Sequence, residues 1–168
     1  MDRASWLLKA LHEASGEVQE ALLAADRGRY DSDLAESAWD LAVHERSTGW
    51  HVEQVLRGRD QLTLHPAEWL STGVETSDVA DLVRIYGRSR SETCGLLWGL
   101  PPDYLERGAQ HPFRGTVSLE DLFVALHERD IETMLALQRI SAPAPLGPGE
   151  RPRGTRQGQE ALASSGAC

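Results

Sequence analysis

Residues 115–140 of the 168-residue chain read GTVSLEDLFVALHERDIETMLALQRI, with apolar residues recurring every three or four positions. This spacing puts the apolar side chains on one face of a helix and predicts a single amphipathic helix over the whole stretch. Arg129, Asp130 and Thr133 lie on that same face, in the middle of the apolar run. A helix that buries this face therefore carries a charged pair and a hydroxyl group into the protein interior.

Three further stretches keep the helical spacing of apolar residues and predict three more helices. They span about residues 4–25, 33–56 and 77–99, and glycine or paired prolines follow each of them, as expected at helix ends. At the start of the last helix, Ser118 is followed three residues later by Asp121, which predicts a helix start of the capping-box kind.

The segments between the predicted helices complete the expected fold. The long connection of residues 58–76 contains a turn at Pro66 and one short helical piece, and PPDYLER at 101–107 predicts a single turn. We find no internal repeat and no alternating strand pattern. The sequence therefore predicts an all-α fold, an up-down four-helix bundle over residues 1–141 with a long crossover loop. Residues 142–168 hold four prolines, five glycines and no aromatic residue, which predicts a disordered, flexible tail.

Composition narrows the classes of protein to be considered. A hydrophobic content of 40 % is enough for the core of one domain. There is no 18-residue apolar run and no charged-then-apolar leader, so we expect neither a membrane span nor a signal peptide. Cys94 and Cys168 are too few for a disulfide framework or a zinc site, which favours a reducing cytoplasm. A formal net charge of −9 argues against binding to nucleic acid.

Ionisable residues interrupt the apolar faces of three predicted helices: Glu45 on the second, Arg90 on the third, and Arg129 with Asp130 on the last. An unpaired charge in a bundle core is costly, so these groups should pair with one another or line a wet cavity. Two interpretations stay open, a structural ion-pair network near one end of the bundle and a ligand or catalytic pocket between helices. In the second interpretation, all of these charges would line one cavity.

The remaining histidines and the cysteine within the helices are weaker candidates. Isolated histidines predict surface or loop positions, and they are His12, His51, His65 and His111. Cys94 faces inward in the third helix and is interpreted as a small buried apolar residue rather than a nucleophile. The chain contains no G-x-S-x-G, no phosphate-binding glycine loop and no C-x-x-C motif.

Three segments carry a family resemblance. They are SAWDLAVHER at 37–46, RSRSETCGLLWGLPPDYLER at 88–107 and HPFRGTVSLEDLFVALHERDIETMLALQRI at 111–140. Together they resemble the DinB-like superfamily of bacterial four-helix bundles, over about residues 4–141. The resemblance implies a small, often dimeric protein. Several members hold a divalent metal with three histidines and use it for thiol transfer, isomerisation of thiol-dependent substrates or hydrolysis.

The metal-binding pattern of that family is not kept in this chain. The family's histidine on the second helix corresponds to Asp40, with Glu45 as the acid that follows it. The family's H-D-x-x-H motif on the last helix reads Arg-Asp-Ile-Glu-Thr at 129–133, so all three ligand positions have changed. An arginine puts a fixed positive charge where the cation would lie, and Asp40 is expected to pair with it. We therefore expect no metal and no other cofactor. The alternative is a shifted metal site that uses Asp40 and His44 with His127 or Asp130.

The first functional hypothesis is a metal-independent enzyme that acts on a small, electrophilic metabolite in secondary metabolism or self-resistance. Carboxylates would serve as general acid or base and the arginines would stabilise developing negative charge. The candidate catalytic residues are Asp40, Glu45 and Asp130, and the candidate substrate-binding residues are His44, Tyr86, Arg90, Arg129 and Thr133.

Three alternative functions remain. The protein could be a non-catalytic small-molecule binding or sequestering protein, with the same cavity and the same orienting charges. It could be a thiol-dependent transferase, as in metal-containing relatives of the family. It could also be a structural or regulatory dimer whose polar centre fixes the helix register. Because Trp39 and Trp50 lie off the inward faces, we expect a two-fold homodimer in each case.

Overall fold

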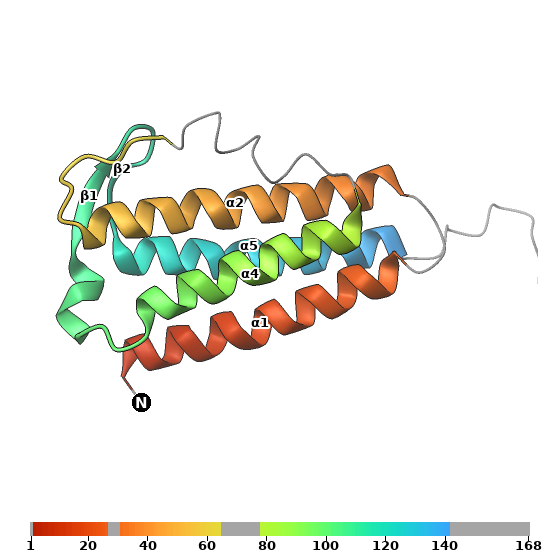
Figure 1. Cartoon of the computed structure of the whole chain (residues 1–168), viewed down its shortest axis with the longest axis horizontal. Coiled ribbons are helices and arrows are strands. Elements are labelled where there is room, and N and C mark those ends of the chain that lie inside the picture. The colour runs from red at the N-terminus through yellow and green to blue at the C-terminus, as the bar shows by residue number, and fades with distance from the viewer. Residues whose placement is uncertain (1, 27–30, 65–77, 142–168) are drawn as a thin grey trace, which may run out of the picture.

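The computed structural model describes residues 2–26, 31–64 and 78–141, and its elements form a four-helix bundle with a small two-stranded sheet at one end (Figure 1). The described part of the chain is mostly helical, as predicted. Its elements, in chain order, are α1 (Arg3–Ala25), α2 (Ser32–Leu56), α4 (Val79–Leu97), the 3-10 helix η1 (Pro102–Glu106), β1 (Gly108–His111), β2 (Gly115–Ser118) and α5 (Leu119–Ser141). The predicted helical piece near Pro66 and the predicted tail lie outside the described residues.

Short polar side chains cap the N-termini of the helices. Asp2 accepts a hydrogen bond from the Ser5 amide at 2.8 Å and so caps α1. An aspartate of the same kind precedes each of α2 and α4, Asp31 and Asp78, so α2 begins one residue before the predicted range of 33–56. At α5 the predicted capping box is confirmed by two reciprocal bonds: the Ser118 amide donates to Asp121 Oδ2 at 2.8 Å, and the Asp121 amide donates to Ser118 Oγ at 3.1 Å.

The order of the helices around the bundle differs from their order in the chain. α1 and α2 each pack against both α4 and α5, so they lie diagonally opposite one another. Figure 1 shows that α2 and α4 run in the same direction, and that α1 and α5 run in the other. The strict alternation of an up-down bundle is therefore not observed. The predicted crossover loop between α2 and α4 falls largely on residues outside the described ranges.

A β-hairpin at one end of the bundle corrects the prediction of a helix that starts at Gly115. β1 and β2 pair antiparallel, with Ala109 opposite Val117, and both of these side chains are buried. Gly115 has a φ of +74°, which suits glycine at the end of the connecting turn. Strands of four residues are too short to show an alternating pattern, and this is why the sequence did not reveal them.

A layer of polar residues divides the core into two apolar clusters. One cluster lies toward the hairpin and contains Leu11 and Phe123, and the other lies toward the far end and contains Val18 and Leu137. Each of the four helices contributes to the layer between them, which consists of Ser15, Glu45, Thr48, Ser89, Arg90, Thr93, Asp130 and Thr133. The polar layer thus lies within the bundle rather than near one of its ends. None of the helices in the described ranges has a stretch apolar enough to cross a membrane.

Candidate functional site

The guanidinium group of Arg90 is the centre of the polar layer and connects all four helices. It donates from Nε and Nη2 to Glu45 Oε2 on α2, at 3.0 and 2.8 Å. It donates from Nη1 to Asp130 Oδ2 and from Nη2 to Asp130 Oδ1 on α5, at 2.8 and 3.0 Å. Its fifth bond runs from Nη1 to the backbone carbonyl of Leu11 on α1, at 3.0 Å. Every one of the five donors of an arginine side chain is therefore used.

Tyr86 completes this arrangement, which we call the Arg90 cluster: Glu45, Tyr86, Arg90 and Asp130. The Tyr86 hydroxyl, one turn before Arg90 on α4, donates to Asp130 Oδ1 at 2.8 Å. The side chains of Glu45 and Asp130 are 1 % exposed and that of Arg90 is 3 % exposed. Burial raises the pKa of the Tyr86 hydroxyl, so the phenol keeps its proton.

Burial also raises the pKa of Glu45 above its usual value, although the Arg90 charge and its hydrogen bonds oppose this effect. The cluster thus has the donors and acceptors of a catalytic site, but its charged side chains are almost wholly buried and, of these, only Glu45 borders a hollow in the described part of the chain. Its geometry is that of a buried ion-pair network, the first of the two interpretations drawn from the sequence.

Arg129 lies next to Asp130 in the chain but belongs to a different site. Its Nη2 donates to Asp40 Oδ2 on α2 at 3.4 Å, and its Nη1 donates to Glu132 at 3.1 Å. The predicted pair of Asp40 and Arg129 is confirmed, at a solvent-facing position where their side chains are 49 % and 33 % exposed. Together with Thr133 they line a shallow hollow of about 180 Å³ between α2 and α5.

The expectation that all the interior charges line one cavity is therefore wrong. Glu45 borders a separate hollow between α2 and α4, and Asp40 and Arg129 border the one between α2 and α5. Arg90 and Asp130 line neither of these two hollows. Successive residues of a helix point about 100° apart, so Arg129 and Asp130 cannot face the same partner.

Asp40, Arg129 and Thr133 lie close together, since all three line the α2/α5 hollow. These are the positions that the resemblance assigns to the metal ligands. These residues do not fit a metal ion. Arginine stays protonated and supplies no lone pair, and it is already bonded to the one carboxylate of the three. Within the described ranges, no group of three or more His, Cys, Asp or Glu side chains is arranged to hold a metal ion.

The prediction of surface histidines holds for His12, which is exposed, but not for His51, and His65 lies outside the described residues. His44 on α2 is half-buried, burial and the nearby Arg129 charge lower its pKa, and its Nε2 has no hydrogen-bond partner among the described residues. His51, which was predicted to lie at the surface, is buried and packs edge-on against the His111 ring with ring centres 4.9 Å apart. A histidine on the inward face of α2 could have been recognised from its spacing to Val52 and Val55.

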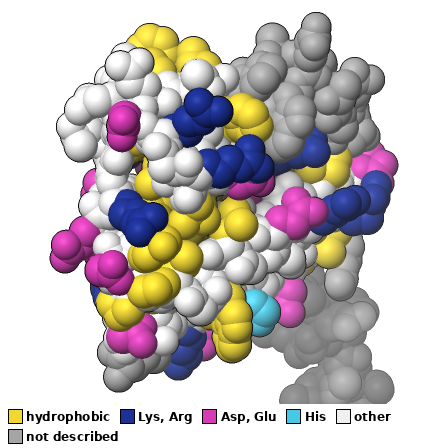
Figure 2. Space-filling view, turned by 60° about the vertical axis from the view of Figure 1, so that its left-hand side comes forward, with side chains coloured by type: hydrophobic (Ala, Val, Ile, Leu, Met, Phe, Trp, Pro, Cys, Tyr) yellow, Lys and Arg dark blue, Asp and Glu magenta, His cyan; other side chains and the backbone are white. Residues whose placement is uncertain are grey.

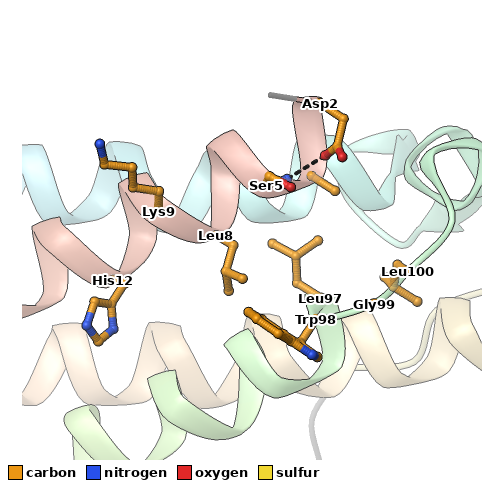
Figure 3. A pocket seen from close by; sticks show the side chains of 10 residues that line it. Asp2, Ser5, Leu8, Lys9, His12, Leu97, Trp98, Gly99 and Leu100 are labelled. Atoms are coloured by element: carbon orange, nitrogen blue, oxygen red, sulfur yellow. Dashed lines mark hydrogen bonds between the residues drawn. The ribbon is translucent and has the colours of Figure 1, made fainter.

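A further hollow, larger than the two above, is one that the sequence did not predict. A groove of about 720 Å³ lies between the first turns of α1 and the end of α4. In Figure 3, Leu8 and Leu97 lie in the space between these helices, the Trp98 ring lies beside them, and the Lys9 amino group is directed away. The residues that line this α1/α4 groove are Asp2, Ala4, Ser5, Leu8, Lys9, His12, Leu97, Trp98, Gly99 and Leu100.

An apolar side chain that lines the groove is exposed to solvent. Trp98 is 75 % exposed, although an indole ring is among the side chains that gain most from burial. Seen with the hairpin end of the bundle turned forward, apolar side chains gather on the surface among scattered charges (Figure 2). A contiguous apolar area on the surface usually marks a binding site. Only an assembled bundle brings residues 2–12 beside residues 97–100, and this is why the sequence gave no sign of the groove.

Comparison of the chain with protein-family models, with curated proteins and with solved structures gave no match.

Proposed function

We propose that this chain is a DinB-like bundle that binds a small, largely apolar molecule in the α1/α4 groove and does not act on it. The single observation that carries the proposal is the groove itself, about 720 Å³ in volume and walled by Leu8, Leu97 and the exposed Trp98 ring. Small-molecule sites are clefts of about 300–1,000 Å³ with mostly apolar walls and a few polar groups. The hollows at Glu45 and at Asp40, of about 220 and 180 Å³, are smaller than that range.

The Arg90 cluster supports binding over catalysis. A general acid or base has to lie within hydrogen-bond reach of the group that it protonates or deprotonates. Glu45 and Asp130 are each 1 % exposed and are held by Arg90. Asp130 lines neither of the two small hollows, so a substrate could reach it only by breaking the hydrogen bonds that connect the helices, and the hollow at Glu45 is too small for most substrates. We therefore assign the Arg90 cluster to helix register, as in the structural alternative, and assign ligand binding to the groove.

The DinB-like part of the proposal rests on the positions of Asp40, Arg129 and Thr133. The resemblance maps them to three metal ligands, which in a metal-binding relative must converge on one point. In this chain all three line one hollow, and the Asp40–Arg129 ion pair occupies it. In a metal-binding relative the metal ion would connect α2 and α5. In this chain the Asp40–Arg129 ion pair connects the two helices without a metal ion.

The experiment is a fluorescence titration with 8-anilino-1-naphthalenesulfonate, an aromatic anion that gains emission in apolar sites. Ser5 lines the groove with an exposed side chain, so Ser5→Phe fills the groove without entering the core. We expect at least a tenfold weaker Kd, which is about 1.4 kcal/mol. Ser91→Phe on the exposed face of α4 is the matched control and should leave Kd unchanged.

Light scattering on the same samples tests the other occupant of this surface, a second copy of the chain. Equal affinity in Ser5→Phe and the parent protein would refute binding in the groove. A dimer that dissociates in Ser5→Phe, with no change in probe affinity, would assign the groove to the predicted dimer contact instead.

An enzymatic function remains a second candidate because of Asp40. Its carboxylate is 49 % exposed beside Arg129, in the hollow that the resemblance points to. In this arrangement Asp40 would act as the base and Arg129 would stabilise an oxyanion. Hydrolysis of p-nitrophenyl acetate that is faster than in buffer, and that falls at least tenfold in Asp40→Asn, would favour this candidate; equal rates in both proteins would reject it.

A further inference from the structure

A separate hollow of about 220 Å³ lies between α2 and α4 and extends from the Arg90 cluster to the surface. We call it the α2/α4 cavity. The lining residues that matter here are Glu45, Gly49, Glu53, Glu92 and Thr93. It shares none of the residues that line the α1/α4 groove, so an inference about it goes beyond the function proposed above.

One carboxylate oxygen at the inner end of this cavity has no partner. Both hydrogen bonds from Arg90 to Glu45 end on Oε2. Glu45 Oε1 is buried and accepts no hydrogen bond from any residue in the described ranges. A buried acceptor without a donor is expensive, because it has given up its bonds to water. The side chain that carries this oxygen is 1 % exposed and forms part of the cavity wall.

The neighbouring residues leave the oxygen open. The Thr93 hydroxyl lies within hydrogen-bonding reach of Glu45, but its single proton is donated to the Ser89 carbonyl at 3.0 Å, so it does not satisfy Oε1 at the same time. Gly49, one turn after Glu45 on α2, forms the facing wall. A Cβ atom at Gly49 would lie 3.0 Å from Thr93 Oγ1, which is closer than ordinary contact. The absence of a side chain at this position therefore keeps the space beside Thr93 free.

The lining of the cavity is more acidic than basic: Glu45, Glu53 and Glu92 lie on it together with one cation, Arg46. Glu45 and Asp130 share the single positive charge of Arg90, so the fully ionised cluster has one negative charge in excess. Glu53 and Glu92 also line the cavity, each in an exposed ion pair of its own helix. A donor that carries one positive charge would supply both things that Glu45 lacks, a hydrogen bond for Oε1 and charge balance.

We propose that the α2/α4 cavity binds a small primary ammonium ion, whose N–H groups donate to Glu45 Oε1. The volume limits the ligand to a few heavy atoms, because it lies below the range of drug-sized sites. Thr93 Oγ1 has an acceptor lone pair for a second N–H. When Glu45 is protonated in the free protein, its proton leaves to solvent as the ammonium ion binds.

The test is a thermal-melting titration with methylammonium chloride, with tetramethylammonium chloride at equal concentration as control. Both cations carry one charge, but only methylammonium has N–H donors. A ligand that binds the folded state alone raises Tm, by about 5 °C or more at a fifty-fold excess over Kd in a chain of this size. We expect a saturable rise with methylammonium and none with tetramethylammonium.

Two variants locate the effect. Glu45→Gln keeps the shape and removes the charge, and Gly49→Ala keeps Glu45 but narrows the cavity; each should abolish the methylammonium shift, whatever its own Tm. Gly95→Ala on α4 is the matched control, since its Cβ would meet nothing within 4 Å, and it should respond like the parent protein. No shift in the parent protein, an equal shift with tetramethylammonium, or a shift that persists in Glu45→Gln would each overturn the proposal.

Discussion

Replacing Arg90 by methionine should cost more stability than any other single loss of charge in the described bundle. Methionine fills the space of the arginine stem but removes five hydrogen bonds to three helices. It leaves Glu45 and Asp130 buried without a cation, at 1 % exposure each. Breaking a buried ion pair by removing one partner costs about 3–5 kcal/mol. The whole stability of a domain is about 5–15 kcal/mol, so Arg90→Met should lose about a fifth of it or more.

The assay is urea unfolding followed by circular dichroism, supported by thermal melting. For a chain of this size, each kcal/mol moves Tm by about 2–4 °C, so we expect Tm to fall by about 6–20 °C. Arg88→Met is the matched control, two residues away on α4, where the Arg88 side chain is 82 % exposed beside Glu92. Because exposed pairs contribute little, that variant should stay within about 0.5 kcal/mol of the parent protein.

A triple variant separates loss of charge balance from loss of packing. Arg90→Met combined with Glu45→Gln and Asp130→Asn removes the two unpaired carboxylates and should recover at least half of the lost stability. The reasoning is refuted if Arg90→Met loses no more stability than Arg88→Met, or if the triple variant is less stable than Arg90→Met alone.

Three further predictions concern Glu45, Cys94 and the changed metal-ligand positions. Because burial raises the folded-state pKa of Glu45 above the usual 4.5, its contribution to stability is complete below about pH 4.5 and is lost as pH rises through the folded pKa. The stability of the parent protein relative to Glu45→Gln, from urea unfolding, should therefore fall as the pH rises above about 4.5, and a difference that rises with pH would contradict this. Burial also raises the pKa of Cys94 from 9.0 to about 11. In a Cys168→Ser background its alkylation by iodoacetamide should be about 100-fold slower than that of an unburied thiol, and an equal rate would disprove this. Elemental analysis of protein purified without chelators should find no stoichiometric transition metal, and about one zinc, nickel or iron per chain would overturn that expectation.

Much of the fold was predictable because helices reveal themselves through local periodicity. The four helices, the Ser118–Asp121 cap and the inward position of Glu45, Arg90 and Asp130 all follow from spacing along the chain. The spacing does not tell which side chains of different helices form hydrogen bonds with one another. These hydrogen bonds depend on the order of the helices around the bundle, which places α4 between α1 and α2 and so brings Arg90 within reach of Leu11 and Glu45 together.

The α1/α4 groove escaped prediction for a related reason. Ser5 and Leu8 look like ordinary positions on an amphipathic helix, and Trp98 looks like the end of another. Only the packing of the first turns of α1 against the end of α4 turns them into the walls of one hollow. The buried charges could be predicted because they interrupt the apolar face of a helix. The apolar groove could not, because its residues fit the ordinary pattern of an amphipathic helix.

The measurement that tests the central claim most directly is a map of backbone amide chemical-shift changes as 8-anilino-1-naphthalenesulfonate is added to ¹⁵N-labelled protein. If the ligand site is the α1/α4 groove, the largest chemical-shift changes will fall on residues 4–12 and 97–100. The amide signals of Glu45 and Asp130 will not shift. Changes centred on Asp40, Arg129 and Thr133 would contradict the account and move the site to the α2/α5 hollow. Equal changes throughout the bundle would show that the probe has no defined site at all.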